Sequence, residues 1–215
     1  MADRLSPLRP PAPDDIPRSA AAALPAATLL AVPYTVQAPF ARWSVHEESC
    51  EEAALLMIHA YLGGDRRPLI EPAEADRELL AMKRWQVAHW GAERDLPLAR
   101  LGELALQYYG HSYQVMPANV EGIQRQLALG RPVMLPVMTH GLGNAHYGAR
   151  SVYHILVLTG FDATGAIAND AGVKEGRGYR YSWAQVFNAM DQVGRQAPAL
   201  RQGRVMLVLT SSSSR

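Results

Sequence analysis

The local sequence pattern changes at Gly130, and this change limits the folds that the chain can adopt. After Gly130, short runs rich in β-branched and aromatic residues alternate with glycine-containing turns: "RPVMLPVM", "YHILVLTGF", "GAIAND", "GYRYSW" and "RVMLVLT". Such runs predict a largely antiparallel sheet. Before Gly130, apolar residues recur at helical spacing and predict helices over residues 50–62, 76–85, 97–109 and 119–129. Helices followed by strands favour an α+β fold.

Two local signals refine this pattern. Ser182 followed by Gln185 matches a capping box and predicts one more helix start inside the second half. Residues 28–40 are apolar but contain Pro33 and Pro39, so they can form a short strand at most.

The length and composition predict one domain with an extension. A chain of 215 residues can bury one core alone. Residues 1–28 are rich in proline and alanine, which predicts a flexible N-terminal extension before a domain over residues 29–210. A formal net charge of +1 gives no reason to expect a nucleic-acid partner. No apolar run approaches the roughly 18 to 20 residues of a membrane span, and no secretory signal is visible, so a cytoplasmic location is the default expectation.

Cys50 is the only cysteine, which excludes an intramolecular disulfide. Ser49 and Glu52 match a capping box, so we expect Cys50 in the first turn of a helix that ends at Gly63. A helix N-terminus favours a thiolate, whereas the four nearby glutamates disfavour one. The helix alone therefore leaves a nucleophile and a small buried apolar residue equally open.

A thiol nucleophile needs an imidazole partner, and the imidazole needs an orienting group. His154 opens the run "HILVLTGFD", and an antiparallel return through "AIAND" brings Asn169 or Asp170 close to it. Gln37 adds an amide donor for a developing oxyanion. Taken alone, His154 also fits a half-buried strand residue, and "ND" also fits turn chemistry.

These residues stand within or beside the runs "VPYTVQAPF", "CEEAALLM", "LALGRPVMLPV", "YHILVLTGFD" and "IANDAGVKEGRGYRYSW". In these runs and in the order of the residues, the chain resembles the papain-fold cysteine peptidases of the bacteriocin-leader (C-thirty-nine) type, in their peptidase-like second branch. The resemblance covers residues 29–209. It implies a papain-like fold, with the nucleophile at a helix N-terminus packed on the antiparallel sheet. It further implies Cys50 as nucleophile, His154 as general base, Asp170 as its orienting residue and Gln37 as oxyanion-hole donor.

The resemblance implies a peptide or protein substrate cleaved through an acyl-enzyme, without a cofactor or metal ion. Many relatives carry Gly-Pro after the cysteine, where this chain has Glu51 and Glu52, and Asn-Asp-Pro where it has Asn169, Asp170 and Ala171. We expect Trp43, Glu51 and Asn169 among the substrate-binding residues. Glu51 would favour a cationic substrate group if it faces the cleft, and residues 139–154 would form a flexible rim.

Three alternatives remain open. The first is a metal site: "HEESC" begins like a zinc-peptidase helix but lacks the second histidine, and His140, His146 and His154 show no recognised ligand spacing. A non-catalytic peptide-binding module can keep the fold without turnover. An acyltransferase would use the same nucleophile, and the sequence leaves the oligomeric state undetermined.

Overall fold

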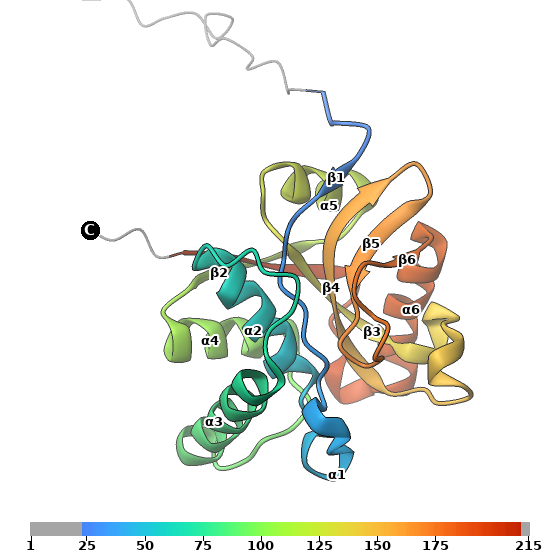
Figure 1. Ribbon diagram of the computed structural model, residues 1–215. Coiled ribbons are helices and arrows are strands. Elements are labelled where there is room, and N and C mark those ends of the chain that lie inside the picture. Colours follow the sequence, from blue (N-terminus) through green and yellow to red (C-terminus); the bar gives the residue numbers. More distant parts are fainter. Residues whose placement is uncertain (1–22, 212–215) are drawn as a thin grey trace, which may run out of the picture.

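An antiparallel sheet with helices on both faces forms the structure, which a computed structural model describes for residues 23–211 (Figure 1). Most of the expected N-terminal extension, residues 1–22, lies outside the described residues. Within residues 23–211 the strands are β1 (Thr28–Leu29), β2 (Ser112–Pro117), β3 (Val133–Met138), β4 (Tyr153–Asp162), β5 (Gly165–Asn169), β6 (Tyr179–Tyr181) and β7 (Val205–Thr210). Their order is β2-β7-β3-β4-β5-β6, and β1 pairs with β4.

The helices agree with the periodicity of the first half and with the cap signal of the second. Between residues 23 and 211 the α-helices are α1 (Trp43–His46), α2 (Cys50–Leu62), α3 (Pro72–Trp90), α4 (Leu98–Tyr109), α5 (Val120–Ala128) and α6 (Trp183–Gln196). The helix expected over residues 76–85 is longer than predicted, because Pro72 at its first turn and Gly91 after its last turn set its ends. No helix in this part of the chain is long and apolar enough to cross a membrane.

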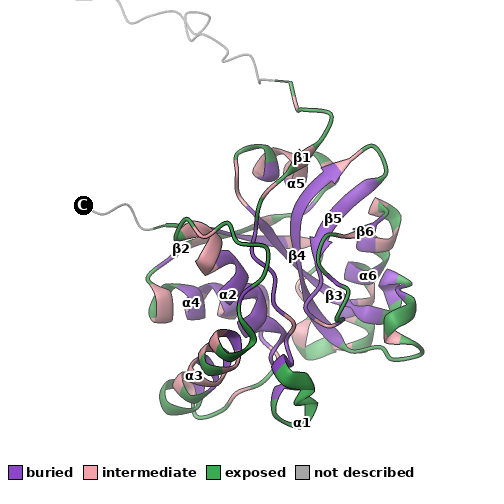
Figure 2. Cartoon of the chain, viewed as in Figure 1, coloured by how far each residue is buried: buried purple, intermediate pink, exposed green. Residues whose placement is uncertain are grey.

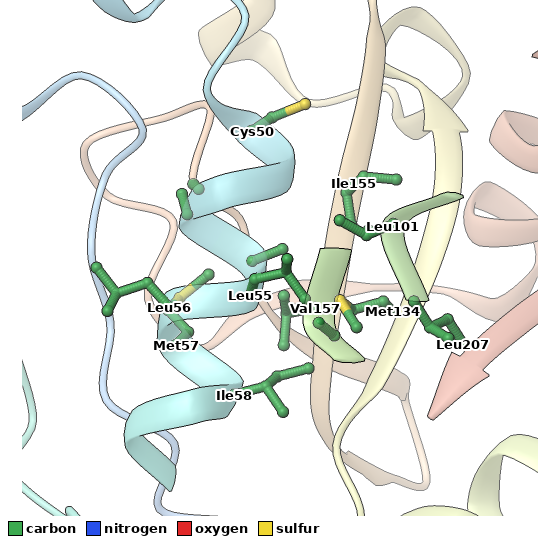
Figure 3. Close-up of a cluster of buried hydrophobic side chains, with 14 of the residues drawn as sticks. Cys50, Leu55, Leu56, Met57, Ile58, Leu101, Met134, Ile155, Val157 and Leu207 are labelled. Carbon is green, nitrogen blue, oxygen red and sulfur yellow. The ribbon is translucent and has the colours of Figure 1, made fainter. Parts of the chain in front are cut away.

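Strand β4 lies in the middle of the core and is buried along almost its whole length (Figure 2). Side chains alternate between the two faces of a strand, so β4 supplies both apolar clusters of the molecule. Ile155 and Val157 join the cluster around α2, α3 and α4 (Figure 3), whereas Leu156 and Leu158 join the cluster around α5 and α6. Burial on both faces explains why the run over β4 is apolar without alternation.

Strand β1 approaches β4 closely, because the two strands pair antiparallel. Leu29 pairs with Gly160, and a Cβ atom on Gly160 would lie 2.3 Å from the carbonyl oxygen of Thr28. Glycine is therefore required for this backbone approach. From there the chain passes the end of β5, where the N–H of Gln37 donates to the carbonyl of Ala171 at 2.9 Å. It then enters α1, which leads to Cys50 at the first residue of α2.

One expectation about local structure is wrong, and one strand was not expected. Ser49 caps no backbone group: its ψ of 22° is not extended, and its hydroxyl lies 3.1 Å from Nδ1 of His46. The helical segment α1 precedes it closely, so the chain enters α2 from a turn rather than from an extended segment. Strand β2 was not expected; it pairs with β7 at the edge of the sheet.

The capping box at Ser182 is confirmed, and it gives a stability prediction. The Ser182 hydroxyl accepts from the N–H of Gln185, while the Gln185 side chain accepts from the N–H of Ser182. We expect Ser182→Ala to lower the free energy of unfolding by about 1 kcal/mol in urea titrations. Ser182→Thr keeps the acceptor and is the control; an equal loss in both variants would contradict the capping role.

Candidate active site

A cavity of about 420 Å³ lies where the start of α2 faces the start of β4. The residues of its wall come from segments far apart in the sequence, which the sheet and α2 bring together. Four predicted site residues line it: Gln37, Trp43, Cys50 and His154.

His154 and Asp170 form a buried pair beside this cavity. Nε2 of His154, the second residue of β4, lies 2.9 Å from Oδ1 of Asp170, which follows the last residue of β5. The side chains are 2% and 0% exposed. The antiparallel pairing of β4 with β5 brings the two residues together, as the sequence predicted. Because Asp170 occupies Nε2, Nδ1 is the ring nitrogen left for a partner in the cavity.

Asp170 accepts three further hydrogen bonds. The hydroxyl of Tyr147 donates to Oδ1 and that of Tyr181 donates to Oδ2, each at 2.5 Å, and the N–H of Gly172 donates to Oδ1 at 3.2 Å. Burial alone would raise the pKa of Asp170, but the bonds from His154 and the two tyrosines lower it below its ordinary value. Asp170 is therefore an anion held in one orientation.

The thiol of Cys50 is buried, with 3% of the residue exposed, and is hydrogen-bonded to its neighbour in sequence. Its S–H donates to Oε2 of Glu51 at 2.8 Å. Burial and the adjacent Glu51 raise the pKa of Cys50 well above the ordinary value, while the backbone N–H of Ile155 acts in the opposite direction. The resting sulfur is therefore a thiol, and ionisation needs a base.

Glu51 does not face the cleft, which corrects one expectation. It is 1% exposed, does not line the cavity, and accepts a hydrogen bond from the N–H of Leu96 at 2.8 Å through Oε1. Burial, followed by the nearby Glu52 and Asp95, raises the pKa of Glu51 well above the ordinary value. A carboxyl group in this position contacts the sulfur rather than a substrate in the cavity.

Two more carboxyl groups surround this contact. Burial raises the pKa of Glu52 to about 7, although Gln86 donates a hydrogen bond to Oε1. Burial and the adjacent Glu48 raise the pKa of Asp95 to about 7. Glu48 and Asp95 both line the cavity, so its wall near Cys50 is acidic and includes one carboxyl group, Asp95, with a raised pKa.

Gln37 and Trp43 lie on the cavity wall as expected. Nε2 of Gln37 donates to the backbone carbonyls of Glu47 at 2.9 Å and His46 at 3.3 Å, so its amide is fixed just before α2. Trp43 is 46% exposed. The first N–H groups of α2 have no acceptor within the helix, and they are further donors close to the sulfur.

Asn169 is not brought to the cavity. Its amide donates to the carbonyl of Val32 at 3.1 Å and accepts from the N–H of Gly178 at 3.2 Å, which ties β5 to the chain after β1. It lines a separate depression. The segment expected as a rim does reach the cavity, through His146, Tyr147 and residues 150–152. No group of three metal-ligating side chains occurs among the described residues.

The two tyrosines on Asp170 were not predicted from the sequence. Tyr147 lies in a short 3-10 helix, Ala145–Tyr147, and a Cβ atom on Gly172 would lie 2.2 Å from its hydroxyl oxygen. Tyr181 ends β6, and its hydroxyl accepts from the amide of Asn144 at 2.7 Å. Side chains alternate along the run "YRY", which is a weak indication that Tyr181 points inward, but no periodic pattern marks Tyr147.

Comparison with known proteins identifies the class to which this fold and site belong. Residues 29–198 match the model of the Peptidase C39 like family, so the chain belongs to that family. A comparison with curated proteins finds no match.

A solved structure supports the same fold. It is a crystal structure of a candidate C39-like peptidase from Bacillus anthracis, with 14% sequence identity and a TM-score of 0.56. The match covers 87% of this chain and 99% of that one. The α+β, papain-like architecture expected from the sequence is thereby confirmed at the level of the fold.

The hydrogen bond from Tyr181 gives a stability prediction. We expect Tyr181→Phe to lower the free energy of unfolding by about 1.5–3 kcal/mol at neutral pH, because a bond to a charged group is lost. The folded pKa of Asp170 is depressed, so the stabilisation it contributes is present above about pH 4, where the unfolded carboxyl is ionised, and fades as the pH falls through the folded value. The loss in Tyr181→Phe should therefore shrink in acid.

The measurement is urea unfolding of each variant at neutral and acidic pH. Tyr179→Phe, in the same strand, is the matched control, since no described residue is hydrogen-bonded to its hydroxyl. An equal loss in both variants, or a loss independent of pH, would show that the Asp170 contact adds nothing specific.

Proposed function

We propose that the chain is a cysteine peptidase that hydrolyses a peptide or other amide bond through Cys50, His154 and Asp170. The observation that carries this proposal is the buried bond from Nε2 of His154 to Asp170 at 2.9 Å, next to a cavity that His154 and Cys50 both line. The bond assigns one ring nitrogen to Asp170 and leaves Nδ1 as the base. Membership of the family supports the same reaction class.

In this mechanism a substrate in the cavity meets a neutral thiol. His154 takes the thiol proton at Nδ1, and the sulfur attacks the carbonyl carbon as a thiolate. Asp170 stabilises the imidazolium that forms, and it stays ionised because four donors hold it. His154 then protonates the leaving amine, and water, deprotonated by His154, hydrolyses the acyl-enzyme.

The oxyanion forms beside Gln37 and the start of α2. The longer of the two Gln37 bonds, 3.3 Å to the carbonyl of His46, is the weaker, so its hydrogen is the one that the oxyanion can share while the 2.9 Å bond keeps the amide in place. The N–H of Cys50 is the second donor. Trp43 forms an exposed apolar part of the cavity wall on which a substrate side chain can pack.

One observation favours a second candidate. The buried thiol with a raised pKa suits a non-catalytic peptide-binding module, in which Cys50 fills space. The two candidates differ in whether His154 controls the reactivity of Cys50, so the following experiment separates them.

We expect His154→Ala to slow alkylation of Cys50 by iodoacetamide at neutral pH, because the base that takes the thiol proton is lost. Cleavage of a mixed peptide library, followed by mass spectrometry, should fall roughly 10²–10⁴-fold in the same variant, because general base catalysis is lost. Cys50→Ala should abolish both signals.

His89→Ala is the matched control, because His89 is an exposed histidine on α3 outside the cavity. Its alkylation and cleavage rates should equal those of the wild type. If His154→Ala also leaves both rates unchanged, and Cys50 titrates as an ordinary thiol, the peptidase proposal is wrong and the binding module is favoured.

A further inference from the structure

The carboxyl group of Glu51 touches the sulfur that the proposed reaction uses, and the mechanism above gives it no task. Its Oε2 lies 2.8 Å from Sγ of Cys50, while its Oε1 is occupied by the N–H of Leu96. At 1% exposure, Glu51 has no access to bulk water. The sulfur is therefore the partner of Oε2.

Charges around Glu51 disfavour its ionised form. The titratable groups that face it are Cys50 and Glu52 on α2, Asp95 from the segment before α4, and Tyr153 on β4. The nearby Lys83 does not pair with it, because Lys83 binds Glu93 at 2.5 Å and the carbonyl of Val45 at 2.7 Å. An unpaired buried carboxylate costs several kcal/mol, so such a group takes up a proton.

We propose that Glu51 is a further catalytic residue, whose neutral carboxyl group donates a hydrogen bond to the sulfur of Cys50 when the thiol gives up its proton. The inference rests on the proposed function, since it concerns the same nucleophile. It also explains how a glutamate can stand beside a nucleophilic cysteine: as a neutral donor, Glu51 favours the thiolate, whereas as an anion it would oppose it.

Two protons take part in this step, one on Cys50 and one on Glu51. The thiol proton moves from Sγ to Nδ1 of His154, and the carboxyl proton stays on Oε2 of Glu51, because Oε1 already accepts from Leu96. The O–H of Glu51 then points at the thiolate, which forms the new bond to the carbonyl carbon while the negative charge passes to the carbonyl oxygen. Glu51 remains neutral throughout.

Glu51→Gln tests this role, because the amide keeps both contacts: its oxygen accepts from the N–H of Leu96 and its NH₂ group donates to sulfur. At neutral pH we expect iodoacetamide to alkylate Cys50 in Glu51→Gln at a rate within about threefold of the wild type. In Glu51→Leu the rate should be at least about tenfold lower, since a hydrogen bond to a charged group is lost. As the pH rises and Glu51 ionises, the alkylation rate of the wild type should fall below that of Glu51→Gln.

A direct readout is the infrared band of a protonated carboxylic acid. The difference spectrum between wild type and Glu51→Gln should contain this band at neutral pH, and the band should disappear in alkali. Glu52→Gln is the matched control for alkylation, because Glu52 is an equally buried neighbour on α2 with no contact to sulfur; its rate should stay within about twofold of the wild type.

The outcomes separate this inference from the proposed function. Absence of the infrared band at neutral pH, or an alkylation rate for Glu51→Gln more than about tenfold above or below the wild type, would overturn the role of Glu51 as a neutral donor. Such a result leaves the His154 dependence of alkylation intact. Loss of the His154 dependence, with the band present, would instead overturn the peptidase mechanism.

Discussion

The hydrogen bond between His154 and Asp170 is the interaction on which the site depends. A carboxylate with no exposed surface is strongly disfavoured unless donors compensate for the lost water. Four donors compensate here: His154, Tyr147, Tyr181 and the N–H of Gly172. Their effect on the pKa of Asp170 exceeds that of burial, since this pKa is lowered. The pair therefore fixes the orientation of the imidazole and reserves Nδ1 for the cavity.

The sheet positions the His154–Asp170 pair, and helix α2 positions the thiol of Cys50 at the same cavity. The pairing of β4 with β5 fixes His154 against Asp170, and the packing of α2 against β4 places Cys50 at the same cavity. The short strand β1 pairs with β4 at Gly160, and the chain after it leads to Gln37, α1 and the start of α2, so one segment positions all three. The site is thus held by strands and a helix, and the loop after β3 adds Tyr147.

The sequence predicted most of the elements, since buried helices and strands leave periodic patterns. It identified α2 with Cys50 in its first turn, the β4–β5 return and the capping box at Ser182. The capping box predicted at Ser49 was wrong. The motif shows that a serine hydroxyl could accept a backbone N–H, but it does not show whether the serine has the backbone conformation that capping requires. Strand β2 escaped detection because an edge strand buries little and shows little pattern.

Long-range contacts explain the remaining differences at the site. Glu51 was expected at the cleft, but the exposure of a side chain cannot be read from its neighbours in sequence. Its burial against sulfur depends on the segment at Leu96, which packs over it from a distant part of the chain. Asn169 and Asp170 are neighbours whose side chains part, one to the chain after β1 and the other to His154. The tyrosines on Asp170 come from a loop and an edge strand, where spacing carries no information about partners.

The tautomer of His154 tests this account most directly, and nitrogen NMR of histidine-labelled protein measures it. With Asp170 ionised and accepting from Nε2, the neutral imidazole of His154 should carry its proton on Nε2, and Asp170→Asn should disturb that preference. A neutral imidazole protonated on Nδ1 in the wild type would contradict the account, because Nδ1 could then not take the thiol proton and Asp170 would have to be the donor to Nε2.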